Sequence, residues 1–503
     1  MGKSCTDLFA GLDCRILGDA EAMVEGLAYR SDRVQPGDAF FCIPGTKVDG
    51  HRFAQDAVDR GARVLVVERE LEVQSASPVT QVLVEDARKA MAWASSSFFD
   101  HPSQSLSLAG ITGTNGKTTT VYLVEHIAHT AGRRTGAIGT VSIRIGDAEE
   151  KSEHTTPESR DLQQILARMR DAGCDTVAME VSSHALDLDR TWGTRFAVTA
   201  FSNLTQDHLD YHHSFEAYFE AKARLFSADY PAKRVICIDD KWGRELLRRC
   251  EQAGDELITT GFDESAQIHP TKVDYAPTHT SLVLSVRGEE LSFDCPLVGR
   301  FNVENAMSAF GICLELGIPA KDIVAGLESA PQTPGRMERI SAAHDGGVSV
   351  FVDYAHSPDA IEKALSTVIE LTSGRTICVF GCGGDRDVTK RPLMGRAALA
   401  ADYAVLTTDN PRTEDPQKIV EDTLAGMGEG EGRYEVVPDR REAIACALSH
   451  ARPGDSVLIA GKGHEDYQLV GDQVLSFDDR KVAAEEMERI FGGAPDANGE
   501  MSD

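Results

Sequence analysis

The sequence of 503 residues contains no apolar run that approaches 18 residues, and its first residues do not form the apolar segment of a secretory leader. We therefore expect neither a transmembrane helix nor a signal peptide. Pairs of cysteines at C-x-x-C spacing are absent, and the eleven cysteines are scattered along the chain, as in reduced cytosolic proteins. These absences predict a soluble, cytoplasmic protein, and the cysteine spacing implies neither a disulfide framework nor a zinc site.

Basic residues are in the minority, with 51 Lys and Arg against 80 Asp and Glu and a formal net charge of −29. A chain of this charge is repelled by phosphate backbones and by anionic lipid headgroups. The composition therefore argues against nucleic acid or a membrane surface as the main partner. Any anionic substrate must be met by local basic groups.

The chain is too long for one hydrophobic core, and about three domains are expected at the usual size of about 100–200 residues. The polar, proline-containing segment Asp100–Ser105 precedes a new apolar strand, and another series of strands begins near residue 336. We therefore place the domains at residues 1–103, 104–335 and 336–503. The small, polar and acidic segment Gly492–Asp503 is expected to be disordered.

Apolar runs alternate with helical patterns, which predicts an α/β fold. The first domain is a small α/β unit. The central domain has a mainly parallel sheet of the phosphate-loop type with helices on both faces, and the C-terminal domain is a second, Rossmann-like unit. A hairpin is expected at Leu282–Arg287 and Leu291–Pro296, with helices at His51–Gly61 and Asn302–Leu316. Other strands are expected at Asp38–Ile43, Arg63–Glu68, Thr176–Val181, Val198–Asn203, Arg234–Asp239, Val348–Tyr354, Thr376–Phe380, Tyr403–Thr408 and Ser456–Ala460.

The segment Ser107–Thr120 changes abruptly from an apolar run to glycines, a lysine and threonines, and a helical pattern follows at Val121–Ala131. This order predicts a strand, a phosphate-binding loop and a helix, because backbone N–H groups at a helix N-terminus bind phosphate oxygens. Lys117 would reach the β- and γ-phosphates, and the Thr118 hydroxyl would hold Mg²⁺. The loop is a variant, since the strict pattern needs glycine where this chain has Ile111. An ordinary Gly-rich turn is the alternative.

Four polar clusters follow predicted strand ends, where open α/β sheets place their ligands. Glu180 would serve as a Mg²⁺ ligand or a structural ion-pair partner, and His208 would ligate a second metal or belong to a helix cap. Arg336 would clamp phosphate and Asp353 would accept hydrogen bonds from ribose hydroxyls, unless both are solvated surface groups. The fourth cluster consists of three loops that we expect to converge on one crevice: Gly381–Arg386, Asp409–Arg412 and Gly461–Glu465.

Eight segments together resemble the Mur ligase family, in that family's motif order and over nearly the whole chain. They are Gly113–Thr119, His154–Pro157, Glu180–His184, Asp207–His212, Ala221–Phe226, Asp353–His356, Asp409–Arg412 and Gly461–Glu465. The resemblance implies three domains that bind a UDP moiety, ATP and an incoming amino acid. It is strongest to members that add meso-2,6-diaminopimelate to UDP-N-acetylmuramoyl-L-alanyl-D-glutamate in peptidoglycan precursor synthesis, which supports cell shape and division. We expect a monomer.

The resemblance implies roles for individual residues in nucleotide and metal binding. The catalytic residues would be Lys117, Lys222 and His208, and the Mg²⁺ ligands would be Thr118, Glu180, His208 and Lys222. Spacing alone favours a solvated helix lysine at position 222, whereas the resemblance implies a carbamate, formed with CO₂, that supplies an oxygen to the metal. ATP would be bound by Gly113, Thr114, Asn115, Gly116, Lys117, Thr118, Thr119, Asn302, Arg336 and Asp353, with the adenosine on Asn302 and Asp353.

The resemblance also implies which residues bind the other substrates. The UDP-muramoyl dipeptide would contact Thr155, Thr156, Ser182 and Arg190, and Ser31 would lie near the uridine. Diaminopimelate would be surrounded by Arg386, Asp409, Asn410, Arg412, Gly461 and Glu465. Two positions depart from the family pattern: Leu188 stands where the family often has Gln, and the segment Pro44–Gly50 differs from the commoner His-Gln-Ala form.

The implied reaction is ATP-dependent amide ligation. The D-glutamate carboxylate attacks the γ-phosphate, ADP leaves, and the amine of diaminopimelate displaces phosphate from the acyl phosphate, so that positioning and charge neutralisation dominate catalysis. One alternative is a relative that adds L-lysine, D-alanyl-D-alanine or another amino acid, or a folylpolyglutamate synthetase, and Asp409–Arg412 argues against these. The other is a nucleotide-gated binding protein, which would leave the charged C-terminal loops unexplained.

Overall fold

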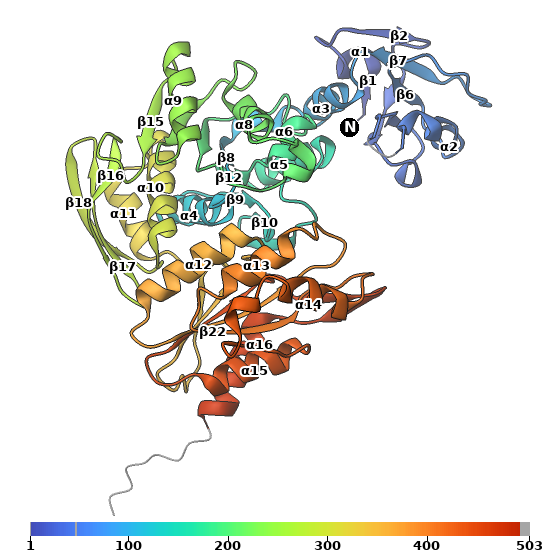
Figure 1. Ribbon diagram of the computed structural model, residues 1–503. Coiled ribbons are helices and arrows are strands. Elements are labelled where there is room, and N and C mark those ends of the chain that lie inside the picture. The colour runs from blue at the N-terminus through green and yellow to red at the C-terminus, as the bar shows by residue number, and fades with distance from the viewer. Residues whose placement is uncertain (1, 46–47, 493–503) are drawn as a thin grey trace, which may run out of the picture. The chain divides into compact units, whose positions relative to one another are not determined.

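The computed structural model describes residues 2–45 and 48–492 (Figure 1). These residues belong to two compact units. The first unit comprises Met1–Leu204, Ser214–Ala266 and Ser308–Ile323, and the second comprises Thr205–His213, Gln267–Met307 and Val324–Asp503. The segment 493–503, for which disorder is predicted, lies outside the described residues, as do residues 46 and 47 of the segment that departs from the family pattern.

The N-terminal part of the first unit contains a five-stranded sheet. Its elements are β1 (Lys3–Ser4), α1 (Cys5–Leu8), β2 (Cys14–Leu17), β3 (Met23–Val24), β4 (Gly26–Ala28), β5 (Asp38–Phe41), α2 (Ala54–Asp59), β6 (Val64–Val67), β7 (Thr80–Val84) and α3 (Ala87–Phe98). The sheet order is β2-β7-β6-β5-β4, with β2 antiparallel to the parallel remainder. Phe41 packs with α1 and α3 on one face, whereas Phe40 packs with α2 on the other. The strands β5 and β6 are fully buried because both faces are covered.

The central part of the first unit is a larger, mainly parallel sheet. Its elements are β8 (Ser107–Thr112), α4 (Lys117–Thr130), β9 (Thr135–Ile138), β10 (Ser142–Ile145), β11 (Ala148–Lys151), α5 (Ser159–Asp171), β12 (Thr176–Glu180), α6 (Ser183–Asp187), β13 (Val198–Phe201), α8 (Phe215–Ala223), β14 (Lys233–Cys237), α9 (Lys241–Ala253) and β15 (Leu257–Thr260). Within this unit the order is β11-β10-β9-β12-β8-β13-β14-β15. The strands β9, β12, β8, β13, β14 and β15 are parallel, whereas β10 is antiparallel to both β9 and β11.

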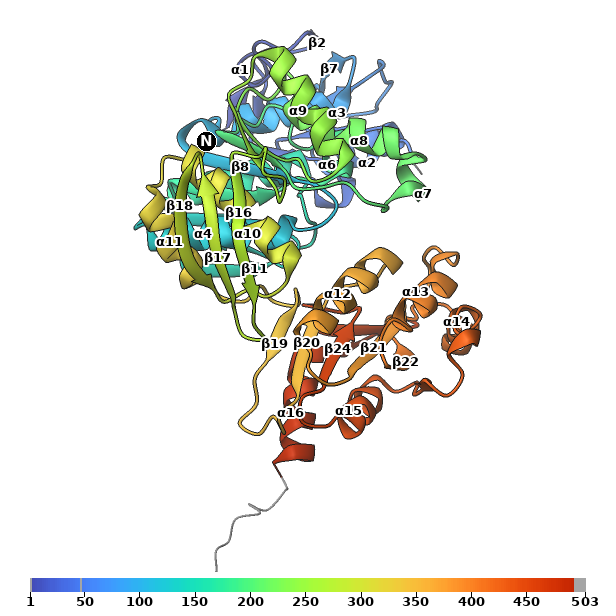
Figure 2. The same cartoon turned by 60° about the vertical axis from the view of Figure 1, so that its left-hand side comes forward.

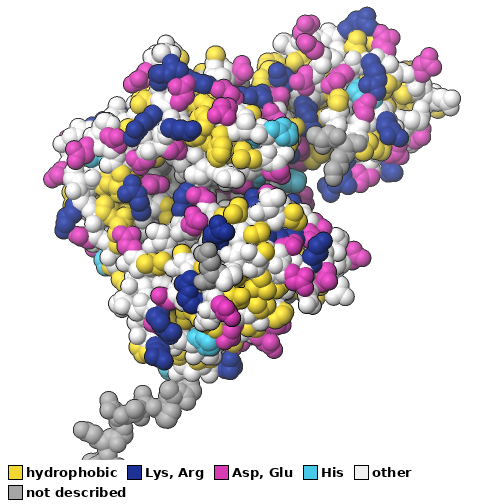
Figure 3. Space-filling model, in the orientation of Figure 1, with side chains coloured by type: hydrophobic (Ala, Val, Ile, Leu, Met, Phe, Trp, Pro, Cys, Tyr) yellow, Lys and Arg dark blue, Asp and Glu magenta, His cyan; other side chains and the backbone are white. Residues whose placement is uncertain are grey.

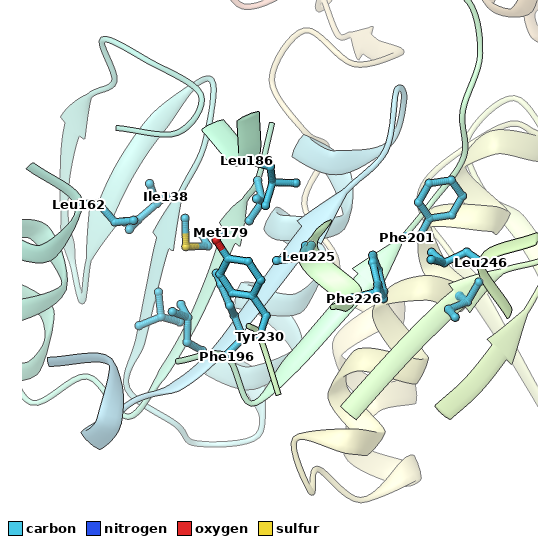
Figure 4. Close-up of a cluster of buried hydrophobic side chains, with 14 of the residues drawn as sticks. Ile138, Leu162, Met179, Leu186, Phe196, Phe201, Leu225, Phe226, Tyr230 and Leu246 are labelled. Atoms are coloured by element: carbon cyan, nitrogen blue, oxygen red, sulfur yellow. The ribbon is translucent and has the colours of Figure 1, made fainter. Parts of the chain in front are cut away.

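One face of the central sheet is buried by apolar side chains from several helices (Figure 4). Leu162 of α5 lies near Ile138 and Met179 of the sheet, and the rings of Phe196 and Tyr230 are 5.9 Å apart. Burial of aromatic and branched side chains of this size contributes about 1.5–3 kcal/mol per side chain. This core holds the carboxyl ends of β8, β12 and β13 in fixed register, which is where the predicted phosphate loop and Glu180 lie.

The second unit contains a three-stranded antiparallel segment and a six-stranded sheet. The first comprises β16 (Ile268–Tyr275), β17 (Thr280–Val286) and β18 (Glu289–Cys295). The second has the order β19-β20-β24-β21-β22-β23, parallel except for β19. Its strands are β19 (Glu338–Ile340), β20 (Ser349–Asp353), β21 (Thr376–Cys382), β22 (Tyr403–Thr408), β23 (Tyr434–Val436) and β24 (Ser456–Ala460).

Helices cover both faces of the six-stranded sheet (Figures 1 and 2). The helices α12 (Pro358–Leu371), α13 (Lys390–Ala398) and α14 (Pro416–Leu424) pack on one face, and α15 (Arg440–His450) and α16 (Asp479–Phe491) pack on the other. A hairpin of β25 (Tyr467–Val470) and β26 (Gln473–Ser476) follows the last strand, and α7 (Leu209–His212) also belongs to this unit. The helices α10 (Arg300–Glu315) and α11 (Ala320–Glu328) contain residues of both units.

The predicted α/β class, with mainly parallel sheets and helices on both faces, is confirmed. Every predicted strand occurs, with ends shifted by no more than two residues. The predicted helix His51–Gly61 begins as a 3-10 turn at Gly50–Phe53, and the hairpin is joined by Arg287 and Gly288 rather than by Gly288 and two glutamates. Both turn residues have positive φ, 51° and 89°, which is typical of a two-residue type I′ turn. The domain boundaries stay predictions.

Two further features bear on function. None of the helices in the described part of the chain is both long and apolar enough to cross a membrane. Figure 3 shows Lys and Arg side chains interspersed with Asp and Glu on the face in view. Because the chain has a formal charge of −29, an anion can be bound only where the fold brings several Lys or Arg side chains or backbone N–H groups close together.

Candidate active site

The predicted phosphate loop connects the end of β8 to the start of α4. Gly113 has φ 148° and Gly116 has φ 87°, both in the region that favours glycine. A Cβ atom on Gly113 would lie 1.9 Å from the Ser202 Oγ and 3.1 Å from the backbone N and O of Asn203, so a larger residue would displace the Ser202 side chain and crowd the Asn203 backbone. The two glycines let the backbone turn sharply, and they aim the first turn of α4 at the space beyond the sheet.

Asn203 and Ser202, which follow β13, fasten the loop. The backbone N–H of Thr114 donates to the Asn203 carbonyl over 2.8 Å, and the N–H of Asn115 donates to its Oδ1 over 2.9 Å. The Ser202 Oγ donates to the Asn115 carbonyl over 2.6 Å. These bonds hold the loop in one conformation before any ligand binds, which lowers the entropic cost of binding. No local sequence pattern predicts this role for either residue.

Two lysines converge on the loop. The Lys117 ammonium donates to the carbonyls of Gly113, at 3.0 Å, and Thr114, at 2.9 Å. The Lys222 ammonium, from α8, donates to the same Gly113 carbonyl over 2.7 Å and lies 4.5 Å from the ring centroid of Tyr218. Lys222 is 1% exposed, so the expectation from spacing of a solvated helix lysine is wrong. A buried ammonium is costly, and such groups gather at functional sites.

Glu180 ends β12, the strand next to β8, and is 1% exposed. Its Oε1 accepts from the backbone N–H of Thr140 over 2.7 Å, and its Oε2 accepts from the Thr140 hydroxyl over 3.1 Å. A Cβ on Gly139 would lie 2.6 Å from Oε1, so a larger residue there would push the Glu180 carboxylate out of this position. The hydrogen-bond partners that the structure records for Glu180 are uncharged. Among these contacts, Glu180 does not form the ion pair that was the alternative to a metal ligand.

Residues predicted to hold the UDP-muramoyl dipeptide lie around Glu180. The Thr156 hydroxyl donates to the Glu180 carbonyl over 2.9 Å and accepts from the Ser182 N–H over 3.1 Å. Arg190 donates to the Thr156 carbonyl over 3.0 Å and pairs with Glu158 at 2.8 Å. Its buried Nε has no hydrogen-bond partner among the residues that the structure describes. The Thr155 and Thr140 hydroxyls are 3.0 Å apart.

Ser31 and His208 are not part of that cluster of contacts. Ser31 lies in a 3-10 turn, Ser31–Arg33, of the N-terminal sheet region, and its proximity lowers the pKa of Asp56. His208 belongs to the second unit, where it precedes α7 with φ 52° and lies 3.4 Å from the Asp207 carboxylate. Burial alone would raise the pKa of Asp207, but His208, His356 and Lys390 together lower it below its usual value. Three basic side chains thus favour the charged form of Asp207.

Three residues of the second unit are predicted to bind the nucleotide. Asp353 ends β20, and its Oδ2 accepts from the Met337 N–H over 2.7 Å. Burial raises the pKa of Asp353, and the nearby Arg336 counteracts this rise. The guanidinium of Arg336 lies 4.7 Å from the ring centroid of Tyr354. Asn302, in the first turn of α10, donates to the Val298 carbonyl over 2.9 Å.

The three loops after β21, β22 and β24 do converge, as predicted. Asn410 donates to the Glu465 Oε2 over 2.9 Å, which joins the second loop to the third. Arg412 donates to the Gly384 carbonyl over 2.7 Å, which joins the second loop to the first. A Cβ on Gly383 would lie 3.1 Å from an Arg412 nitrogen and 3.8 Å from the Arg386 Cγ, so the two arginines flank this glycine.

A lysine to which the sequence analysis gave no role lies at the centre of these loops. Lys462 is 0% exposed, and its Nζ lies 3.1 Å from the Asn410 Oδ1, 3.4 Å from the Asp409 Oδ1 and 3.5 Å from the Glu465 Oε2. A buried cation between two carboxylates fixes their orientation and offsets their mutual repulsion. The only signal in the sequence was its position between Gly461 and Gly463, directly after a strand.

The fold and the site define a class: an α/β protein with a nucleotide phosphate loop, two loop lysines and a separate set of charged loops at the carboxyl ends of a second parallel sheet. Three family models match the chain: "Mur ligase family, catalytic domain" at residues 23–99, "Mur ligase middle domain" at 111–313, and "Mur ligase, glutamate ligase domain" at 335–463.

Similar proteins agree with the family models. The UDP-N-acetylmuramoyl-L-alanyl-D-glutamate–2,6-diaminopimelate ligase of Gloeobacter violaceus is 46% identical over 95% of this chain and 96% of its own. The ligase of the same name from Clostridium botulinum is 41% identical over 96% and 99%. A solved structure of such a ligase has a TM-score of 0.71 at 31% identity and covers 97% of this chain and 99% of its own. The chain belongs to the Mur ligase family, and the predicted three-domain α/β fold is that of the family.

Proposed function

We propose that the chain is an ATP-dependent ligase that joins meso-2,6-diaminopimelate to UDP-N-acetylmuramoyl-L-alanyl-D-glutamate, a step in the synthesis of peptidoglycan precursors. The observation that carries the proposal is the convergence of Arg386 and Arg412 with Asp409, Asn410 and Glu465 in one set of loops. Diaminopimelate carries two amines and two carboxylates, so its recognition needs cations and anions side by side. The names of the similar proteins support the same substrate.

The first half-reaction makes a leaving group on the dipeptide substrate. The D-glutamate carboxylate attacks the γ-phosphorus of ATP, a P–O bond to ADP breaks, and an acyl phosphate forms. Lys117 would neutralise charge on the transferring phosphoryl group, because its ammonium lies against the loop that would hold the β- and γ-phosphates. Thr155, Thr156, Ser182 and Arg190 would orient the dipeptide, and a substrate oxygen would satisfy the buried Nε of Arg190.

The second half-reaction forms the amide. The amine of diaminopimelate attacks the acyl carbon, the C–O bond to phosphate breaks, and the amine proton is lost. Asp409, Asn410, Gly461 and Glu465 would orient the amino acid, and Lys462 would hold their carboxylates in place. No nucleophilic side chain is needed, so positioning and charge neutralisation account for catalysis.

Mg²⁺ would be held by hard oxygen donors, and the residues present fit such an ion. Glu180 offers a buried carboxylate and Thr118, 4% exposed, offers a hydroxyl in the first turn of α4. Bound there, the ion would neutralise phosphate charge. His208 is carried over as a further ligand from the family alone. Asn302, Asp353 and Arg336 would bind the adenosine and phosphates. A cytoplasmic location and a monomeric state stay predictions.

A substrate panel tests the proposed function. Purified protein, ATP, Mg²⁺ and UDP-muramoyl dipeptide are incubated with meso-diaminopimelate, L-lysine or D-alanyl-D-alanine, and phosphate release and the tripeptide product are measured. We expect product with diaminopimelate and phosphate release that depends on it. Preference for lysine would identify a different ligase of the family, and phosphate release that ignores every amino acid would identify a nucleotide-gated binding protein.

Lys222 fits a Mg²⁺ site only as a carbamate, because an ammonium would repel the metal. In this modification the neutral amine attacks CO₂, an N–C bond forms, and one proton is released, which leaves a carboxylate on Nζ. We expect Lys222→Ala to lose most activity and to be partly restored by acetate or formate. Carbon-13 NMR of protein equilibrated with labelled bicarbonate should show a carbamate signal that is lost in this variant.

The matched control for Lys222 is Lys241→Ala. Lys241 also lies 4.5 Å from an aromatic ring centroid, that of Trp242, but it is exposed at the start of α9. This variant should keep its ligase activity and its carbamate signal, and acetate should not change its activity. Full activity in Lys222→Ala, or the same carbamate signal with and without Lys222, would show that the carbamate is not formed there.

A further inference from the structure

A helix and an edge strand of the six-stranded sheet bring together three side chains of metal-binding type. Among residues 2–45 and 48–492, one group of three His, Cys, Asp or Glu residues places a ligand atom of each within 4.8 Å of the others: Glu435, Cys446 and His450. Glu435 lies on β23, an edge strand of the sheet, and Cys446 and His450 lie on α15. The group belongs wholly to the second unit and uses none of the proposed catalytic residues.

The spacing on α15 explains why two of the ligands face the same way. Cys446 and His450 are four residues apart, so they lie one turn apart on the same face of the helix. The strand β23 pairs in parallel with β22, and Glu435 lies opposite Val405 in this pairing. The pairing fixes the position of Glu435 relative to the helix. The arrangement therefore depends on secondary structure on both sides and not on an exposed loop.

The interatomic distances are close to those of a tetrahedral metal site. The Cys446 Sγ lies 3.2 Å from the Glu435 Oε2, and the His450 Nε2 lies 3.9 Å from the Glu435 Oε1. With Zn–S of about 2.3 Å and Zn–N or Zn–O of about 2.0–2.2 Å, ligand atoms of a tetrahedral zinc site are roughly 3.5 Å apart. The three ligand atoms lie within 4.8 Å of one another on side chains that are half-buried or exposed, so a bound metal would draw them closer together.

Tyr403 of β22 orients two of the three ligands from the neighbouring strand. Its ring packs against the His450 imidazole with centroids 4.9 Å apart, and its hydroxyl lies close to the Glu435 carboxylate. Outer contacts of this kind hold first ligands in position in metalloproteins. Of the eleven cysteines, all of which are described, nine are buried, and Cys14 and Cys446 are half-buried. Cys446 is thus a thiol that a solute can reach, and it lies beside an imidazole and a carboxylate.

We propose that Glu435, Cys446 and His450 form a binding site for a divalent transition metal of the zinc class, with the fourth position open to water. One thiolate, one imidazole and one carboxylate suit Zn²⁺ or Co²⁺ and disfavour Mg²⁺, which prefers oxygen ligands alone. A metal bound there would link α15 to the edge strand β23. Its expected role is to stabilise this edge of the sheet, because the group lies outside the residues of the proposed reaction.

Cobalt spectroscopy on the full-length protein tests the site. The protein is treated with a chelator, freed of the chelator and titrated with Co²⁺ in the presence of excess Mg²⁺, which occupies oxygen-ligand sites. We expect one equivalent of Co²⁺ to produce a thiolate-to-cobalt charge-transfer band and the intense visible bands of tetrahedral cobalt. Zn²⁺ should abolish these bands by displacement and raise the Tm of the wild-type protein. The absence of a charge-transfer band in the wild type would overturn the proposal.

Variants assign the ligands and provide the control. Cys446→Ser should lose the charge-transfer band and the Zn²⁺-dependent rise in Tm, while Cys14→Ser, which removes the other half-buried thiol, should keep both. Glu435→Gln and His450→Gln should each weaken Co²⁺ binding at least about tenfold. Circular dichroism and ligase activity show that each variant is folded. A band that persists in Cys446→Ser, or that is lost equally in Cys14→Ser, would place the metal elsewhere and overturn the assignment.

Discussion

Alanine in place of Lys117 is expected to lower kcat more than about a hundredfold while the protein remains folded. The Lys117 ammonium is held against the phosphate loop by the carbonyls of Gly113 and Thr114. Its charge is therefore in place before the substrate arrives, and a preorganised charge of this kind stabilises the transition state for phosphoryl transfer more than the ground state. Steady-state phosphate release with saturating diaminopimelate measures the effect, and thermal unfolding checks the fold.

A lysine at another helix start provides the control for Lys117. Lys321 is the second residue of α11 and is exposed, so Lys321→Ala removes the same charge from a comparable position without touching the phosphate loop. It should leave kcat within about twofold of wild type, as expected for a surface substitution. Near-normal turnover in Lys117→Ala would refute the phosphate role, and equal losses in both variants would indicate an effect of net charge alone.

Alanine in place of Arg412 is expected to lower kcat/KM for meso-diaminopimelate at least about a hundredfold and to leave the low value for L-lysine nearly unchanged. The two amino acids differ by the carboxylate at the far end of the side chain, and a guanidinium binds a carboxylate with two charge-assisted hydrogen bonds worth about 1.5–3 kcal/mol each. The Arg412 guanidinium donates to the Gly384 carbonyl, and the Arg386 side chain lies beside the neighbouring Gly383, so both arginines belong to one set of loops.

Two further variants separate recognition from structure at Arg412. Arg412→Lys keeps the charge but loses the planar fork, so it should recover only part of the selectivity. Arg396→Ala removes an exposed arginine of α13 in the same unit and should change neither kcat/KM value. Arg412 has φ 52°, and its N–H donates to the Leu469 carbonyl over 3.0 Å. The alternative to substrate recognition is therefore that Arg412 only stabilises the turn. An equal fall of kcat/KM for both amino acids would support that role.

The parts of the site that could be predicted are those in which neighbours in the sequence act together. Gly113, Gly116 and Lys117 lie within one turn of backbone, so the order of residue types predicts the strand, the loop and the helix. The strands were predicted to within two residues because parallel strands buried on both faces are continuous apolar runs. The convergence of the loops at Arg386, Asp409 and Gly461 followed from the rule that parallel strands end at one edge.

Other features could not be predicted, because they depend on residues that are distant in the chain. Lys222 is 109 positions from Gly113, and no local pattern shows that its helix turns that lysine inward. The hydrogen bond from the Asn115 N–H of the phosphate loop to Asn203 likewise depends on which strands are neighbours in the sheet. The same is true of the burial of Lys462 between three polar side chains. The proposed metal site could not be predicted from the cysteine spacing either. Glu435 comes close to Cys446 and His450 only because β23 pairs with β22.

Periodicity, turn residues and motif order are properties of short segments and of their succession, so they were sufficient to predict the α/β class, the phosphate loop and the family. Which distant groups share one environment depends on how the elements pack. This packing turned Lys222 from an apparently solvated lysine into a buried cation at the loop, and it placed Lys462 between Asp409 and Glu465. The physical reason is that burial and charge pairing depend on packing between elements, and this packing is set by the order in which the strands join the sheet.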